Sequence, residues 1–134
     1  MKTRLVLFMA AALLTVSAPL VAHHGFAAEY NIADLVVLKG TLSSFDWVNP
    51  HAFLTIAVKD DNGGIKLWRI EGGPISFVKE AGWTPEMLQQ LVKSRDPIIV
   101  TGYRARKSPN ASLAGGAWAK QIELSDGRKL QFHD

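Results

Sequence analysis

Alternating apolar and polar residues predict strands on both sides of a short helical region. In most of these segments an apolar side chain recurs at every second position, as it does in a strand with one buried face. A tight turn of the hairpin type, Asp60-Asp61-Asn62-Gly63-Gly64, separates two of them. The predicted strands cover residues 36–47, 52–59, 65–71, 97–106, 118–124 and 129–132.

The first predicted strand changes phase part-way along its length. Leu38 and Leu42 share one face. Phe45 and Trp47 then restore an apolar face one position out of step, after the pair Ser43-Ser44. Such a slip is typical of a bulge that bends a strand strongly, and a strand bent in this way can serve both halves of a barrel.

The helical region covers about residues 74–93. Gly73-Pro74 opens a first stretch that Gly82 ends, and Thr84-Pro85 opens a second stretch with Thr84 as its N-cap. Three strands, a helical insertion and two or three further strands follow the order of an OB-fold. The sequence therefore predicts a mainly β, OB-fold-like barrel of five or six strands, with an open α+β sandwich as the alternative.

In-phase apolar residues define the predicted core of this barrel. Trp118 is in phase with Ile122 and is expected there, while Trp83 is expected to plug one barrel end. Phe53 is the aromatic residue most expected on an open face, where a ligand ring could stack. The aliphatic residues expected to be buried are Leu38, Leu42, Leu54, Ile56, Val58, Ile70, Val100 and Ile122.

Residues 1–22 have the pattern of a secretory signal peptide. A basic start is followed by the apolar run Leu5–Leu14, which is too short to span a bilayer. Cleavage is expected after Ala22, with residues 27–28 as the alternative position. Residues 23–134 then form a single domain that is exported to a bacterial periplasm and keeps no membrane span.

Charge and cysteine content narrow the function classes. Two of the 15 basic residues lie in the leader, so 13 basic and 12 acidic residues remain, a formal net charge of +1. This near-neutral balance argues against a nucleic-acid partner. The chain has no cysteine, which excludes disulfides, thiolate zinc sites and iron–sulfur clusters and leaves stability to a packed core.

The histidines suggest a metal site. Cleavage of the leader would make His23 the N-terminal residue, followed by His24. The free α-amine, with a pKa of about 7.7–8.0, can bind a metal ion together with these imidazoles. His51, after a turn fixed by Pro50, is the third ligand expected. Nitrogen ligands in a planar arrangement favour copper. His133 lies far along the chain and is expected to contribute less.

Two other interpretations of the chain remain. The histidines can instead be a solvated chain end and a turn residue, in which case the domain is an OB-type module that binds a peptide, glycan, small molecule or protein partner without metal. Glu29, Asp46 and Glu71 lie beside strand or turn positions, the last two near tryptophans, but they form no recognisable acid–base pair and are interpreted as surface carboxylates. The protein is therefore not expected to be an enzyme.

Short motifs distributed along the chain after the leader also resemble a known family. The motifs are His23-His24-Gly25-Phe26-Ala27-Ala28-Glu29-Tyr30, Leu38-Lys39-Gly40, Trp47-Val48-Asn49-Pro50-His51, Glu71-Gly72-Gly73, Gly82-Trp83, Val100-Thr101-Gly102-Tyr103-Arg104-Ala105 and Asp126-Gly127-Arg128-Lys129-Leu130. As a set they resemble the DUF6152 family, small exported bacterial proteins without an established function. One departure is Arg95-Asp96-Pro97, where the family tends to have a Gly-Asp pair. The resemblance implies no activity, cofactor or partner.

Overall fold

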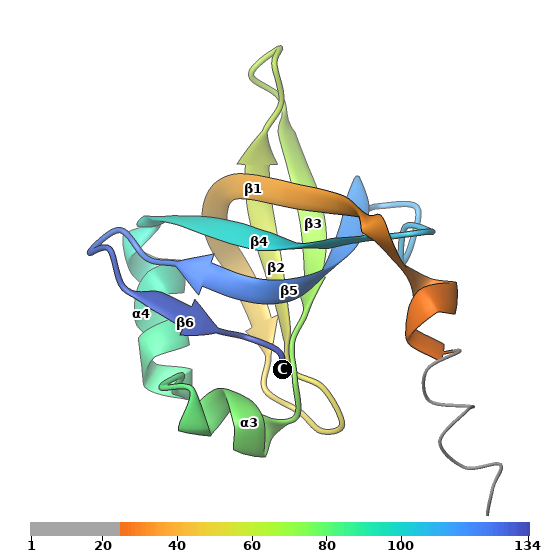
Figure 1. Ribbon diagram of the computed structural model, residues 1–134. Helices are drawn as coiled ribbons and strands as arrows, with labels where there is room; N and C mark the ends of the chain where they lie inside the picture. Colours follow the sequence, from red (N-terminus) through yellow and green to blue (C-terminus); the bar gives the residue numbers. More distant parts are fainter. Residues whose placement is uncertain (1–24) are drawn as a thin grey trace, which may run out of the picture.

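A computed structural model describes residues 25–134 of the chain (Figure 1). The leader, its cleavage site, and the predicted metal ligands His23 and His24 lie outside the described residues. A short helix at residues 25–29 precedes the first strand. The elements that follow are β1 (Tyr30–Asp46), β2 (Phe53–Lys59), β3 (Ile65–Glu71), α3 (Ile75–Glu80), α4 (Pro85–Ser94), β4 (Pro97–Ala105), β5 (Gly115–Glu123) and β6 (Lys129–Gln131).

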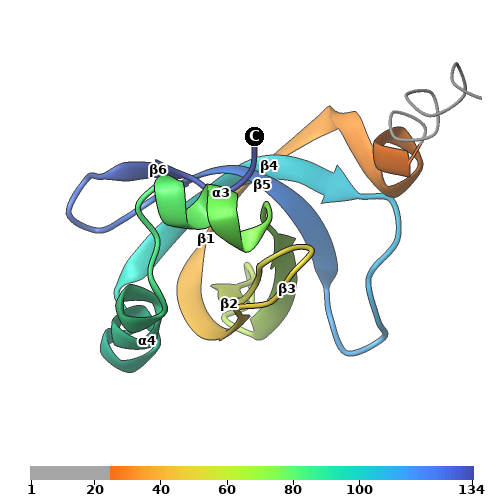
Figure 2. The same ribbon diagram turned by 90° about the horizontal axis from the view of Figure 1, so that it is seen from below.

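Five of the strands close into a barrel. Hydrogen-bonded neighbours run in the order β3-β2-β1-β4-β5-β6, and a parallel pairing of β3 with β5 completes the ring. β6 pairs with β5 outside the ring. The helices α3 and α4 connect β3 to β4 at the lower end of the barrel in Figure 1, and Figure 2 views the ring from that end. This is the predicted OB-fold-like barrel, with its helical insertion in the predicted place.

The bend of β1 allows it to pair with two different strands. Its first part pairs with β4 and its last part with β2, and a bulge between Leu42 and Ser44 confirms the predicted phase slip. Gly40 pairs on both sides at the bend. A Cβ atom there would lie 2.4 Å from the carbonyl oxygen of Ala57, so only glycine fits between the two neighbours.

The helical insertion follows its predicted boundaries closely. Thr84 is the N-cap of α4, and its side-chain oxygen accepts a hydrogen bond from the Met87 amide at 3.1 Å. Arg95 ends α4 in a left-handed conformation with φ of 56°. Within residues 25–134, no helix is long and apolar enough to cross a membrane.

The predicted core is confirmed at seven of its eight aliphatic positions. Ile56, Ile70, Val100 and Ile122 have no exposed surface. Leu38, Leu42 and Leu54 are also buried. The exception is Val58, which is half-buried and packs against the edge of the core. It lies near the tip of the β2–β3 hairpin, which projects beyond the ring (Figure 1).

Trp118 is buried, but on the opposite face of β5 from the one predicted. A register shift opposite Thr101 and Gly102 interrupts the alternation of β5. As a result Ala119 and Ile122 both join the core, whereas the indole of Trp118 stacks on Tyr103 on the outer surface of the barrel, with ring centroids 5.7 Å apart. The expected phase with Ile122 is therefore wrong, because a bulge lies between the two residues.

Candidate functional site

The segment Glu71-Gly72-Gly73, at the end of β3, fastens two distant parts of the chain together. On one side, the Gly72 amide donates to the carbonyl of Ala52 at 2.8 Å, and the Ala52 amide donates to the carbonyl of Gly73 at 3.0 Å. On the other side, the Gly73 amide donates to the carbonyl of Phe132 at 2.7 Å. The residues next to Ala52 and Phe132 are thereby brought to one place.

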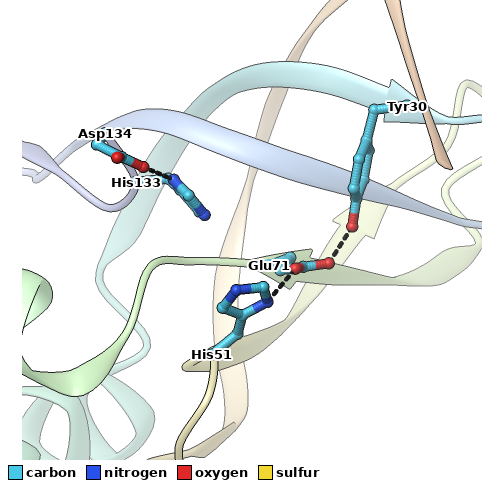
Figure 3. Close-up of polar contacts among 5 residues, drawn as sticks. All are labelled: Tyr30, His51, Glu71, His133 and Asp134. Carbon is cyan, nitrogen blue, oxygen red and sulfur yellow. Dashed lines mark hydrogen bonds and ion pairs between the residues drawn. The ribbon is translucent and has the colours of Figure 1, made fainter. Parts of the chain in front are cut away.

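His51 is one of these neighbouring residues, and it is held from both directions. Before it, the side-chain oxygen of Asn49 accepts a hydrogen bond from the amide of Ile75 at 3.1 Å, which fixes the β1–β2 loop to the start of α3. Its own Nδ1 atom contacts Oε1 of Glu71 (Figure 3). A neutral imidazole whose Nδ1–H faces a carboxylate keeps a free lone pair on Nε2.

His133 is the other neighbouring residue, and Phe132 anchors it. The Phe132 ring is fully buried and lies edge-on to Trp83, with centroids 5.4 Å apart. A Cβ atom on Gly72 would lie 2.4 Å from this ring, so the chain end packs directly on glycine backbone. The indole of Trp83, itself fully buried, donates to the carbonyl of Gln131 at 2.8 Å. The last residues of the chain are therefore held in place by core contacts.

The anchored chain end places the two imidazoles side by side. The His133 ring lies 4.6 Å from the Trp118 indole and 5.7 Å from the His51 ring, measured between centroids. Figure 3 shows it extending from Asp134 toward His51. Its Nδ1 atom is buried and touches Oδ1 of Asp134, although this contact lacks hydrogen-bond geometry. His133 was expected to contribute less because it lies far along the chain, but it is the one other histidine among residues 25–134 and it lies beside His51.

This pair fits one metal ion only if further ligands are added. An imidazole nitrogen lies about 2.0–2.1 Å from a bound ion, so two rings on one ion keep their centroids within about 6.4 Å of each other. The observed 5.7 Å meets that limit. Within residues 25–134, however, no group of three or more His, Cys, Asp or Glu side chains could hold a metal ion. Glu71 contacts His51 at Nδ1, so its carboxylate does not form a third ligand beside the two rings.

Tyr30 completes a polar chain that ends at His51. Its hydroxyl donates to Oε2 of Glu71, while Oε1 of the same carboxylate contacts His51 (Figure 3). Burial raises the pKa of Tyr30 well above its ordinary range, and the hydrogen bond to Glu71 and the charges of Glu71 and Glu29 raise it further. The phenol therefore keeps its proton and remains a donor to Glu71.

The segment before β1 packs against the same outer surface. The Phe26 ring lies 5.4 Å from Tyr30 and 5.3 Å from Trp118, between centroids. Arg106 holds the segment from the other side, because its backbone amide donates to the Glu29 carbonyl and its Nε donates to the Ala27 carbonyl, both at 2.8 Å. Trp118 thus contacts both Phe26 and His133.

A pocket of about 420 Å³ opens beside this polar chain. It lies between the 25–29 helix, β3 and the β4–β5 loop, on the face and loop with which OB-folds bind ligands. Phe53 is partly exposed there, as predicted, and the Arg69 guanidinium lies 4.1 Å over its ring. The pocket walls include Tyr30, Phe53, Glu71, Arg106, Lys107 and Pro109.

Three of the residues described above were not assigned to the site from the sequence. Glu71 was considered only as one of three carboxylates that form no recognisable acid–base pair, although counting back from the hairpin turn pairs it with Phe53, two residues from His51. Tyr30 and His133 gave no such signal, because each reaches the site through packing of a chain end. Of the other carboxylates considered, Asp46 binds Arg69 at 3.0 Å and Glu29 lines the pocket.

Comparison with known proteins gives a family and no function. A family model described as a family of unknown function, DUF6152, matches residues 11–114. The match includes Tyr30, His51 and Glu71, whereas His133 lies beyond it. No curated protein matches the chain.

Proposed function

The chain belongs to the DUF6152 family, and we propose that it is an exported periplasmic protein that binds a transition-metal ion, copper by preference, through His51, His133 and its mature N-terminus. One observation carries the proposal. The imidazoles of His51 and His133 lie 5.7 Å apart, and each has its Nδ1 atom against a carboxylate. The remaining nitrogen of each ring is then available to an ion between them.

Carboxylates behind the rings support this interpretation. Histidines that bind metal ions almost always direct the other ring nitrogen to a carboxylate, carbonyl or water, which fixes the tautomer and the ring orientation. Glu71 has that relation to His51, and Tyr30 fixes Glu71 in turn. Asp134 also touches Nδ1 of His133, but without hydrogen-bond geometry, so this support belongs to His51. A turn histidine with a purely structural role needs no second imidazole facing it.

The mature N-terminus supplies the ligands that the pair lacks. In this proposal the leader is cleaved after Ala22, and the α-amine and imidazoles of His23 and His24 complete a nitrogen-rich site. These residues precede Gly25 directly. Phe26 packs on the Trp118 indole, which also contacts the His133 ring. Several imidazoles and an amine form a donor set that suits Cu(II) and disfavours calcium or magnesium. The function we propose is binding, for storage, delivery or sensing of the ion.

Copper affinity of the mature protein tests the histidine pair. We expect His51→Ala and His133→Ala each to weaken Cu(II) binding about tenfold or more, measured by competition with a chelator. The double variant should lose much less than the product of the two single losses, because both residues hold the same ion. Unchanged affinity in both single variants would rule out a site built on this pair.

The carboxylate behind His51 has a matched control in Asp46. Glu71→Gln keeps the side-chain shape but removes the charge that orients His51, so we expect about tenfold weaker binding. Asp46→Asn removes a carboxylate that pairs with Arg69 at 3.0 Å and touches no histidine, so the affinity should stay at the wild-type value. Equal losses in the two variants would indicate a general charge effect and not a defined site.

The contribution of the N-terminus is tested separately. One alanine added before His23 moves the α-amine away, and we expect weaker binding from that change alone. Intact mass of the exported protein gives the first mature residue, which should be His23. A mature form that starts after residue 28 would lack both leading histidines, and the proposed N-terminal ligands would then be wrong.

A further inference from the structure

The pocket beside Tyr30 and Glu71 has polar groups that the metal proposal does not use. Several of its charged groups already have partners within the fold. Arg69 binds Asp46, with Nη2 and Oδ2 3.0 Å apart, and lies on the Phe53 ring. Both oxygens of Glu71 are occupied, one by Tyr30 and the other by His51. Arg69 therefore has a counter-charge in Asp46, and neither oxygen of Glu71 is left without a contact.

Arg106 and Lys107 differ from these paired groups. The Nε atom of Arg106 donates to the carbonyl of Ala27 at 2.8 Å, which orients the guanidinium. Its two terminal nitrogens remain available to donate to a ligand. Within residues 25–134, no carboxylate forms an ion pair with either Arg106 or Lys107. Glu29 also lines the pocket, and Glu71 lies deeper with both oxygens in contact with Tyr30 and His51. Two cationic groups without an ion-pair partner among residues 25–134 therefore remain at the pocket.

The rest of the pocket is mostly apolar. Pro109 and the alanines 28 and 105 line it together with the Phe53 ring. The β4–β5 loop packs tightly on β5, because a Cβ atom on Gly116 would lie only 3.0 Å from the Pro109 ring. An apolar hollow with a few polar groups at one side is the usual form of a small-molecule site, and about 420 Å³ lies within the range of such sites.

We propose that this pocket binds a small organic anion, with its carboxylate or phosphate at Arg106 and Lys107 and its apolar or aromatic body against Phe53 and Pro109. The planar guanidinium suits both oxyanions because it donates two parallel hydrogen bonds. The apolar body contributes by leaving water. Glu71 borders both sites, but neither His51 nor His133 lines this pocket, and the proposed binding does not depend on bound metal.

Four small probes separate the two parts of the proposed recognition. Hippurate and phenyl phosphate each carry an aromatic body and one oxyanion, whereas N-benzoylglycinamide lacks the charge and inorganic phosphate lacks the body. In amide NMR spectra of the mature protein with chelator present, the first two should cause saturable shifts at residues 28–30, 69–71 and 105–109. N-benzoylglycinamide, which lacks the charge, and inorganic phosphate, which lacks the aromatic ring, should each bind about tenfold more weakly. The stronger of the first two identifies the oxyanion class.

Variants test whether the cations hold the probe. Arg106→Gln and Lys107→Gln should each weaken the better probe several-fold, while Lys66→Gln, on the β2–β3 hairpin, should leave it unchanged. Because Arg106 also holds the 25–29 helix, Arg106→Lys provides a second variant that keeps the charge and should retain part of the affinity. His133→Ala should not affect the probe, so failure of the metal proposal and failure of this one are distinguishable. Equal affinity for wild type, Arg106→Gln and Lys107→Gln would overturn the proposed site.

Discussion

Glu71 accepts partners from two widely separated parts of the chain. Tyr30 lies 41 residues before it and donates to one oxygen, while His51 contacts the other. A carboxylate used on both sides cannot turn toward a third group without breaking one contact. At the scale of single residues, this arrangement couples the first residue of β1 to the β1–β2 loop, so a change at Tyr30 reaches His51 through one side chain.

The raised pKa of Tyr30 gives a prediction about alkaline stability. The folded pKa lies above the ordinary value of about 10, so the folded chain holds a proton that the unfolded chain releases above that pH. The contribution of Tyr30 to the free energy of unfolding is therefore complete below about pH 10 and is lost as pH rises further. The difference in that free energy between wild type and Tyr30→Phe should shrink from pH 9 to pH 11, measured by urea unfolding.

A spectroscopic titration checks the same point directly. The chain has two tyrosines, so Tyr103→Phe leaves Tyr30 as the sole source of tyrosinate absorbance. We expect that absorbance to appear only well above pH 10, together with loss of folded structure. A midpoint near 10 in a protein that is still folded would show that Tyr30 is neither buried nor bound to Glu71.

Among the elements, local alternation was sufficient wherever a strand keeps one phase. This alternation correctly predicted the inward-facing residues of β2, β3 and β4 and also the phase slip in β1. Each of these patterns depends only on the residues of one strand. It failed in β5, where the face of Trp118 depends on a bulge set by pairing with β4. A bulge of this kind results from contact between two strands, and the sequence of either strand alone does not reveal it.

The close approach of β4 and β5 predicts a strong effect of Gly102→Ala. A Cβ atom there would lie 2.0 Å from the carbonyl oxygen of Trp118, so the two strands must separate or shift. We expect a loss of about 1–3 kcal/mol in the free energy of unfolding, with altered tryptophan fluorescence. Gly25→Ala is the control, because a Cβ atom at that position has no neighbour within 4 Å. Equal stability of the two variants would contradict the described packing.

The two valines of different burial provide a matched test of the core. Val100 has no exposed surface and Val58 is half-buried at the core edge. Truncation removes the same atoms from each, so Val100→Ala should cost about 1–3 kcal/mol and Val58→Ala distinctly less. Urea unfolding measures both. A larger loss of unfolding free energy for Val58→Ala would mean that packing at the hairpin contributes more to stability than packing inside the ring.

For the whole molecule, the candidate site combines parts that the sequence could and could not place. His51 was predicted as a site residue because the local sequence Asn49-Pro50 indicates a turn directly before it. The position of His133 follows instead from Phe132, whose burial against Trp83 and Gly72 only the complete fold decides. A chain end has no strand pattern to mark where it docks. The barrel was therefore predictable in outline, and the docking of its C-terminal residues beside His51 was not.

Two truncations separate anchoring from metal binding at this chain end. Removal of residues 133–134 should leave the fold almost unchanged and reduce copper affinity as His133→Ala does. Removal of residues 132–134 also takes away the buried Phe132 ring, and should cost about 3–5 kcal/mol of stability. Thermal unfolding and copper competition measured on both proteins would check this. Similar stability of the two truncated proteins would show that Phe132 does not anchor the end.

The parallel pairing of β3 with β5 has a consequence for how the protein folds. Trp68 pairs with Gly115 across the whole helical insertion and β4, so ring closure is a long-range event. Contacts between residues far apart in sequence form slowly, and the edge of β3 stays open until β5 arrives. When the chain emerges from its N-terminus first, it therefore forms an unclosed sheet whose unpaired β3 edge can associate with other chains. The speed at which residues 115–118 become available should set how much of the protein aggregates before it folds.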